Sequence, residues 1–163
     1  MVPVITKAVL MLSQKAKYAL RALLVLAEAG DAKPVLIADI AERHNLPKKF
    51  LEQILLDLKH HGLVQSRRGR SGGYSLLKPA SEISFGQVVR IIDGPLAPLP
   101  CLSKMAYRRC EDCPGEESCA IRRVFALTHQ VTTTVLDRTT LTDALRESPL
   151  QPGVPRQEGA RAG

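Results

Sequence analysis

The sequence predicts a mainly α-helical fold with a small β-hairpin, and three observations lead to this prediction. Two short helical patterns follow one another across a tight turn, and a basic, glycine-rich hairpin comes directly after them. A third helical pattern, long and apolar on one face, lies towards the C-terminal end of the chain. This order of elements is typical of a winged helix-turn-helix followed by a long C-terminal dimerisation helix.

The composition indicates one folded domain with a polyanionic partner. The chain has 163 residues, of which 45% are hydrophobic and 24% charged, as in folded proteins. Its net charge is +7: residues 11–94 hold 13 basic and 8 acidic side chains, whereas residues 95–163 hold 9 and 8. The N-terminal excess of positive charge favours a nucleic acid. Aromatic residues make up only 4%, which disfavours stacking on single strands and favours double-stranded DNA.

Neither a membrane segment nor an export signal is predicted. No apolar run reaches the roughly 18 residues that span a bilayer. The first ten residues lack the positive start, the long apolar core and the cleavage site of a secretory signal. We therefore expect a cytoplasmic protein with no membrane partner. In that compartment, clustered cysteines more often hold a metal or cluster or do redox chemistry than form disulfides.

The first helical pattern covers residues 11–29, with Ser13 as its N-cap and Gly30 as its stop. Apolar residues from Leu36 to Ala41 then recur at helical spacing, which predicts a short helix that ends at Asn45.

The second helix of the helix-turn-helix is predicted to begin at Pro47 and to end at Gly62. One face is apolar and includes Phe50. The opposite face is polar and, in a helix-turn-helix, usually enters the major groove. It carries Lys48, Lys49, Glu52, Gln53 and His60.

The hairpin is predicted from two short alternating segments, 63–66 and 74–77. Three arginines and three glycines lie between them, in the run Arg67, Arg68, Gly69, Arg70, Ser71, Gly72, Gly73. Glycines let the backbone approach a phosphate, and the arginines supply the positive charge.

The C-terminal half is predicted to contain two helices and a long loop. Ser84 caps a helix over residues 85–93, and a loop over 95–119 is too long to be a mere connection. A helix of about 27 Å follows. Its apolar face is formed by Ile121, Val124, Phe125, Thr128, Val131 and Val135. Thr140 or Thr142 restarts a short turn that ends near Leu145.

The four cysteines all lie in or at the end of that loop. They are Cys101, Cys110, Cys113 and Cys119, separated by eight, two and five residues. Four thiolates can complete a tetrahedral zinc site or ligate an iron-sulfur cluster. From the residues alone, a cluster, zinc, redox thiols and incidental reduced cysteines all stay open.

Three segments resemble the Rrf-two family of transcription regulators, the iron-sulfur winged-helix proteins of the IscR and NsrR type. The segments are LSQKAKYALR (12–21), LPKKFLEQIL (46–55) and GLVQSRRGRSGGY (62–74). The resemblance extends from Met11 to about Leu145. It implies a homodimer that binds palindromic double-stranded DNA.

The resemblance also assigns roles to single residues. By matching position, Phe50, Glu52 and Gln53 would read bases in the groove, and Arg68 with Gly69 would form the wing contact. Core packing is the alternative for Phe50, and a solvated carboxylate is the alternative for Glu52. The predicted DNA-binding set is Lys48, Lys49, Phe50, Glu52, Gln53, Arg67, Arg68, Gly69 and Arg70.

For the cysteine loop, the resemblance implies an iron-sulfur cluster, 2Fe-2S or 4Fe-4S, with zinc as the weaker alternative. Cys101, Cys113 and Cys119 match the usual three ligands, and Cys110 is the candidate fourth. The first spacing is longer than in relatives, and Lys17 stands where some of them have an acidic ligand. The cluster type and the fourth ligand are therefore left open.

The predicted function is a DNA-binding transcription regulator whose operator binding depends on a cluster that senses iron, redox state or nitric oxide. A small iron-sulfur or zinc carrier is the alternative, but it leaves the basic hairpin without a role. The sequence shows no nucleophilic residue with a general base at a suitable spacing, and no P-loop pattern. An enzyme is therefore not predicted. The predicted divisions are an N-terminal extension (1–10), a winged-helix domain (11–94), a cysteine-rich sensor loop (95–119), a dimerisation helix (120–146) and a disordered tail (147–163).

Overall fold

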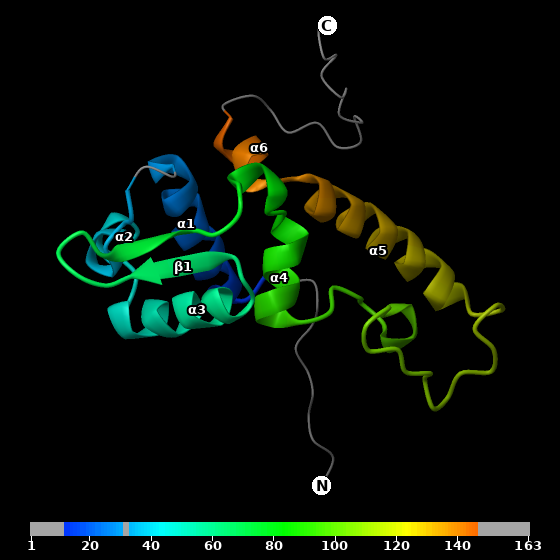
Figure 1. Ribbon diagram of the computed structural model, residues 1–163. Helices are drawn as coiled ribbons and strands as arrows, with labels where there is room; N and C mark the ends of the chain where they lie inside the picture. Colours follow the sequence, from blue (N-terminus) through cyan, green and yellow to red (C-terminus); the bar gives the residue numbers. More distant parts are fainter. Residues whose placement is uncertain (1–11, 31–32, 147–163) are drawn as a thin grey trace, which may run out of the picture.

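The computed structural model describes residues 12–30 and 33–146, so the predictions for residues 1–10 and 147–163 lie outside the described residues. Its elements are α1 (Gln14–Ala29), α2 (Ile37–Arg43), α3 (Lys48–His60), β1 (Val64–Arg67), β2 (Gly73–Leu76), the 3-10 turn η1 (Ala80–Glu82), α4 (Phe85–Asp93), the 3-10 turn η2 (Pro100–Leu102), α5 (Ala120–Arg138) and α6 (Leu141–Leu145). The predicted fold class is confirmed: the chain is mainly helical with one antiparallel hairpin (Figure 1).

The hydrophobic core lies between α1, α3 and α4. These helices form because their apolar residues recur at helical spacing, and the apolar sides face one another. The largest fully buried side chains include Leu23 and Leu26 of α1, Leu51, Ile54, Leu55 and Leu58 of α3, and Val88 of α4. Burial of each such leucine or isoleucine contributes roughly 1.5–3 kcal/mol.

Ser13 is the N-cap of α1, as predicted, because its Oγ accepts the Ala16 N–H at 3.0 Å. Its own backbone N–H and hydroxyl both donate to the Asp93 carboxylate at the end of α4. One residue therefore starts α1 and ties it to α4.

The turn between α2 and α3 has the tight form expected of a helix-turn-helix. Asn45 adopts φ 50°, in the left-handed region that asparagine tolerates better than most residues. Leu46 is buried, and its N–H donates to the Ala41 carbonyl at 2.8 Å. Pro47 is the N-cap of α3 rather than its first residue, and Leu36, predicted on the apolar stripe of α2, precedes α2 and is exposed.

The hairpin forms where it was predicted, with both strands shifted by one residue. Val64 pairs with Leu76 and Arg67 pairs with Gly73 in the antiparallel register. Tyr74 also exchanges two backbone hydrogen bonds with Val35, each of 2.8 Å. Gly73 lies at this crossing with φ 140°, and a Cβ there would stand 2.5 Å from the Val35 carbonyl oxygen, so the close approach requires glycine.

The C-terminal elements return to the core. Ser84 caps α4 as predicted, and Thr140 rather than Thr142 caps α6, in a capping box with Asp143. Ser84 and Thr140 form an antiparallel bridge, and Leu141 is fully buried. The end of α5 is thereby joined to the winged-helix core.

In Figure 1, α5 extends away from that core, with the cysteine loop (residues 95–119) beside its N-terminal end. None of its residues is buried. Its exposed apolar face consists of Ile121, Val124, Leu127, Val131 and Val135, which are 37–65% exposed. Phe125, predicted on the apolar face, is half-buried and therefore does not belong to this exposed row. Within the described part of the chain, no helix has the length and apolar character needed to cross a membrane.

Candidate nucleic-acid interface and cysteine loop

The polar face of α3 is exposed to solvent, as the helix-turn-helix prediction requires. The five predicted α3 contact residues, Lys48, Lys49, Phe50, Glu52 and Gln53, are all exposed. Leu51, Ile54, Leu55 and Leu58 are all buried on the opposite face. The helix therefore rests on the core by one side and presents two cations, a carboxylate, an amide and a ring on the other.

Phe50 is partly packed and partly exposed. Its ring meets the Tyr18 ring of α1 edge to face, with the centroids 5.8 Å apart, and yet the residue remains 38% exposed. Packing on Tyr18 fixes the ring at the edge of the core while leaving area for a ligand. Glu52 is exposed, and no hydrogen bond or ion pair joins it to the described residues.

A polar contact fixes α3 against α1. The Lys15 ammonium lies 2.7 Å from the Asp57 carboxylate, and the Gln53 amide donates to the same carboxylate at 3.1 Å. These hydrogen bonds, chiefly that from Lys15, hold the pKa of Asp57 below its usual value. One carboxylate thus positions both the helix and the side chain of a predicted DNA-contacting residue.

The hairpin tip presents a basic surface. Arg67, Arg68, Gly69 and Arg70 are all exposed. The tip is closed by a hydrogen bond of 2.9 Å from the Gly72 N–H to the Gly69 carbonyl. A Cβ at Gly72 would stand 2.6 Å from the Arg67 carbonyl, so the tight tip depends on this glycine.

A side-chain contact holds the hairpin next to α3. The Lys59 ammonium, in the last turn of α3, donates to the Ser66 hydroxyl of β1 at 2.7 Å. This contact joins the predicted groove-reading helix to the predicted wing. Nothing in the sequence pattern pointed to this pair.

The cysteine loop is held by contacts of its own. Cys101 is buried in η2, and the Arg108 N–H donates to the Pro100 carbonyl at 3.2 Å. The Tyr107 hydroxyl bonds the Glu116 carboxylate, which raises the pKa of Tyr107. These contacts give the loop internal order within the described residues.

The other three cysteines occupy distinct places in this loop. Cys110 and Cys113 flank a turn in which the Cys113 N–H donates to the Cys110 carbonyl at 3.3 Å. Cys119 is the N-cap of α5, and its Sγ accepts the Arg122 N–H at 3.4 Å. Burial raises the pKa of the Cys110 thiol, as do the neighbouring Cys101 and Cys113, and Cys101 is within hydrogen-bond reach of it.

The donor chemistry of this loop suits a cluster, because four thiols are the ligands that iron-sulfur clusters and zinc prefer. The thiols do not form a completed site: among residues 12–30 and 33–146, no group of three or more His, Cys, Asp or Glu side chains is arranged to hold a metal ion. The structure thus brings Cys110 near Cys101 and Cys113, and places Cys119 at the start of α5.

The contact between α4 and α5 was not predicted. The Arg90 guanidinium donates two hydrogen bonds to the Asp137 carboxylate, at 2.6 and 2.9 Å, which raises the pKa of Arg90. Gly86 of α4 lies against the same carboxylate, and a Cβ at this position would overlap it. A glycine in the first turn of a helix with a strongly apolar side was the available signal for such a close approach.

The helix-turn-helix, the adjoining hairpin and their exposed basic residues define a DNA-binding transcription regulator of the winged-helix class. The comparison with protein families agrees: residues 12–147 match the Rrf2 model, described as an iron-dependent transcriptional regulator. The chain belongs to the Rrf2 family, which confirms the resemblance found in the sequence.

Individual relatives cover most of the chain. It is 51% identical over 138 residues to an rrf2-like HTH-type transcriptional regulator of Rhodobacter capsulatus, an alignment that covers 83% of this chain and 92% of the relative. It is 36% identical over 129 residues to the HTH-type transcriptional regulator IscR of Escherichia coli, which covers 79% of this chain and 72% of that protein. These relatives are regulators, which points to a protein that is not an enzyme.

Solved structures share the fold. CymR, the global cysteine regulator of B. subtilis, superimposes with a TM-score of 0.70 at 32% identity, covering 83% of this chain and 95% of that one. IscR of T. potens gives a TM-score of 0.64 at 29% identity, with 83% and 86% covered.

Proposed function

We propose that this regulator binds palindromic DNA as a homodimer and that an iron-sulfur cluster in the cysteine loop controls its operator affinity. The observation that carries the proposal is the placement of the cysteine loop at the N-terminal end of an α5 whose apolar face is exposed. One segment would therefore hold the cluster and border the surface between two copies.

The DNA-contacting surface in this proposal consists of the exposed face of α3 and the hairpin tip. Lys48 and Lys49 would meet phosphates, and Gln53 and Glu52 would face bases, where a carboxylate can accept a hydrogen bond from cytosine N4. Arg67, Arg68 and Arg70 would approach the backbone or the minor groove, with Gly69 allowing close contact.

The homodimer is supported by the spacing of the exposed apolar residues on α5. Ile121, Val124, Leu127, Val131 and Val135 follow one another at steps of three, three, four and four residues, which keeps them along one side of the helix, where a second helix can pack. Pairing two copies along this face removes exposed apolar area from water. Binding to a palindromic operator would require two α3 helices about 34 Å apart or a multiple of that distance.

The cluster is supported by the donor set and by relatives named IscR, whereas the structurally similar CymR is named as a cysteine regulator. Cys101, Cys113 and Cys119 would hold it, with Cys110 as the fourth candidate. A bound cluster supplies redox and ligand-exchange chemistry. The protein's part is to link the loop, through Cys119 as the N-cap of α5, to the dimer surface, in the cytoplasm where thiols stay reduced.

The test starts from protein purified without oxygen after iron-replete expression, with its operator found by selection from randomised duplexes. We expect a brown protein containing iron and sulfide, and an operator affinity that changes at least about tenfold when the cluster is removed, which corresponds to about 1.4 kcal/mol of coupling. Cys113→Ala should remove the colour, whereas Cys110→Ala should have the smaller effect. A colourless protein, or equal affinity with and without the cluster, would contradict the sensing role and leave DNA binding intact.

A further inference from the structure

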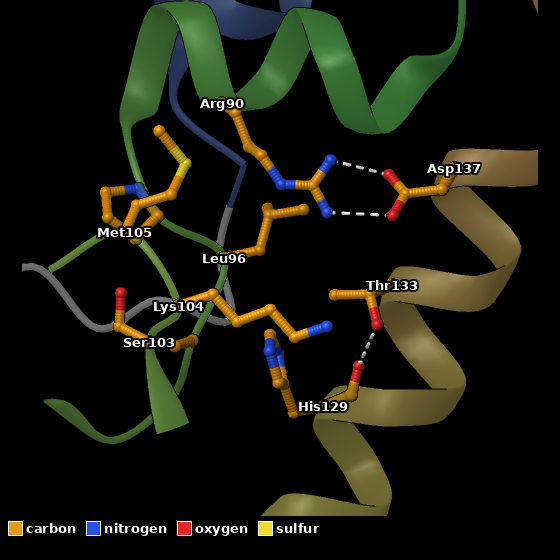
Figure 2. Close-up of a pocket in the computed structure, with 10 residues that line it drawn as sticks. Arg90, Leu96, Ser103, Lys104, Met105, His129, Thr133 and Asp137 are labelled. Atoms are coloured by element: carbon orange, nitrogen blue, oxygen red, sulfur yellow. Dashed lines mark hydrogen bonds and ion pairs between the residues drawn. The ribbon is translucent and has the colours of Figure 1, made fainter. Parts of the chain in front are cut away.

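A pocket between α4, the cysteine loop and α5 has no part in the proposed function. It is lined by Arg90 from α4, by Leu96, Lys104 and Met105 from the loop, and by His129 and Asp137 from α5 (Figure 2). Its volume is about 100 Å³. Since roughly 150 Å³ accommodates a benzene molecule, the space suits a ligand of about four to six non-hydrogen atoms.

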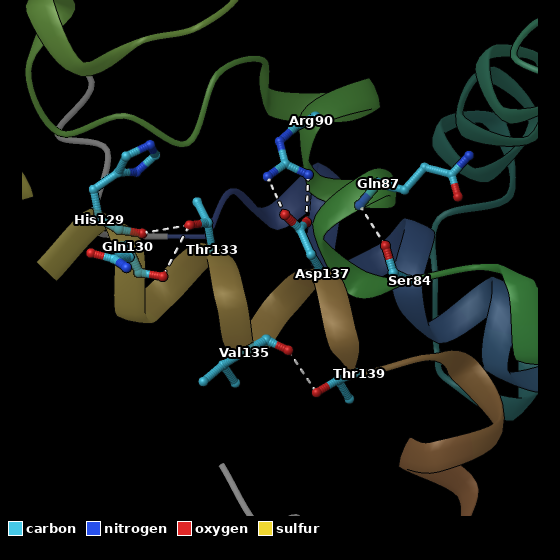
Figure 3. A network of polar contacts seen from close by, with 9 residues as sticks. All are labelled: Ser84, Gln87, Arg90, His129, Gln130, Thr133, Val135, Asp137 and Thr139. Carbon is cyan, nitrogen blue, oxygen red and sulfur yellow. Dashed lines mark hydrogen bonds and ion pairs between the residues drawn. The ribbon is translucent and has the colours of Figure 1, made fainter. Parts of the chain in front are cut away.

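The charged groups of this pocket leave one cation in excess. The Asp137 carboxylate accepts both hydrogen bonds of the Arg90 guanidinium, so these two charges offset each other (Figure 3). Lys104 contributes a further positive charge, and no ion pair joins it to the carboxylates of residues 12–30 and 33–146. Figure 2 shows its side chain extending towards α5, next to the His129 ring.

His129 adds a polar group without a partner. Its Nδ1 is buried and makes no hydrogen bond with the described residues. Buried polar nitrogens in folded proteins are nearly always hydrogen-bonded, so this unpaired atom, in a ring that lines the pocket, favours a bound polar group beside that ring. The nearby Thr133 hydroxyl does not fill this need, because it donates to the His129 backbone carbonyl at 2.7 Å (Figure 3).

The remaining wall is largely apolar. Leu96 and Met105 line it beside Lys104 and His129, together with Pro95 and Ala97. An inorganic anion would make no apolar contact with these side chains. A carboxylate with a short hydrocarbon part would contact both the apolar and the polar side chains of the pocket.

We propose that this pocket binds a small carboxylate anion, with its oxygens between the Lys104 ammonium and the His129 ring and its hydrocarbon part against Leu96 and Met105. Such a ligand contacts the first part of the cysteine loop and the middle of α5 at once. It would hold the loop against the helix, independently of what the cysteines bind.

The test uses propionate as the probe, titrated at constant ionic strength into the isotope-labelled full-length protein and followed by NMR. We expect saturable shifts at Leu96, Lys104 and His129, with a dissociation constant in the millimolar range, since so few atoms make contact. Propionamide, which has the same shape without the charge, should cause none of them. Sulfate that binds the same residues as tightly as propionate would contradict the proposed carboxylate ligand.

Variants separate this site from a general attraction of anions to a basic protein. Lys104→Gln should weaken propionate binding about tenfold or more, and His129→Phe should weaken it while keeping a ring of similar size. Lys78→Gln, which removes an exposed lysine outside the pocket, is the matched control and should change nothing. Propionate binding that survives Lys104→Gln, or an absence of saturable shifts in the wild-type protein, would overturn the proposal. The readout requires neither DNA nor a cluster, so its failure is distinct from failure of the proposed function.

Discussion

The winged-helix core and α5 use their apolar residues in opposite ways. In the core, α1, α3 and α4 turn their leucines, isoleucines and valines inwards, and the largest of these side chains are fully buried. In α5, no residue is buried, and five large apolar side chains are 37–65% exposed. The core therefore supplies its own hydrophobic stabilisation, whereas the apolar face of α5 gains stabilisation only when another surface covers it.

The largest expected effect comes from a substitution in the core, compared with a substitution on the exposed face of the same helix. Leu55 is fully buried and its neighbour Leu56 is 41% exposed, so the two form a matched pair. Leu55→Ala should lower the free energy of unfolding by about 2–5 kcal/mol, because it leaves a cavity. Leu56→Ala should change it by about 0.5 kcal/mol or less. Urea unfolding of both variants at one protein concentration measures the difference, and equal losses would contradict the described burial.

The next effect concerns the exposed face of α5. Val131→Glu places a charge in the middle of the proposed dimer surface, so we expect the dimer dissociation constant to rise at least about a hundredfold, equivalent to about 2.7 kcal/mol. Sedimentation across a range of concentrations measures it. Gln130→Glu, which adds the same charge at an exposed neighbour off the apolar row, should leave the dimer largely intact. A dimer unaffected by Val131→Glu would place the interface elsewhere.

A smaller effect is expected at the hairpin. If Arg68 neutralises one phosphate, Arg68→Ala should weaken duplex binding about tenfold and reduce the slope of log affinity against log salt by about one. Binding measured at several salt concentrations gives both numbers. Arg21→Ala provides the control, since Arg21 is an exposed arginine of α1 outside the predicted contact set. An unchanged salt slope in Arg68→Ala would remove the phosphate contact from the proposal.

The smallest expected effect on stability comes from removing the ion pair between Lys15 and Asp57. The folded-state pKa of Asp57 lies below its ordinary value of 3.8, so its stabilisation is present above that value and is lost as the pH falls through the lower folded-state pKa. Asp57→Asn should cost less than about 1 kcal/mol at pH 7, because the groups are partly exposed, and the cost should shrink as the pH falls below 3.8. A double-mutant cycle with Lys15→Gln checks the coupling, and a loss that does not depend on pH would assign the effect to packing.

Most of the fold could be predicted because its helix caps and stops depend on residues that are close together in the sequence. Ser13 and Ser84 as caps and Gly30 as a stop are local signals, and each one is confirmed; of the two candidates for the start of α6, Thr140 is the N-cap. Strand ends were wrong by one residue, because the pairing runs from Val64 with Leu76 to Arg67 with Gly73, one residue further into the basic, glycine-rich run than predicted.

The candidate site was less accessible to sequence reasoning. The exposed α3 and hairpin residues could be predicted because their types and spacing distinguish them. The contacts that position them, such as Lys59 with Ser66 and Arg90 with Asp137, join residues whose types occur commonly on surfaces. Only the folded arrangement selects these pairs. The same holds for the pocket at His129, whose lining comes from three separate segments.

Helix α5 packs against the core near its own C-terminal end, where Gly86 of α4 lies close to Asp137. The helix is attached to the core near its C-terminal end, by the Arg90 ion pair and by the Phe85 N–H that donates to the Thr139 carbonyl at 2.9 Å. Its 19 residues extend about 28 Å from there to Cys119. A tilt of about 10° at the attached end moves the far end by about 5 Å. Small angular changes at the attached end thus correspond to displacements of several ångströms at Cys119.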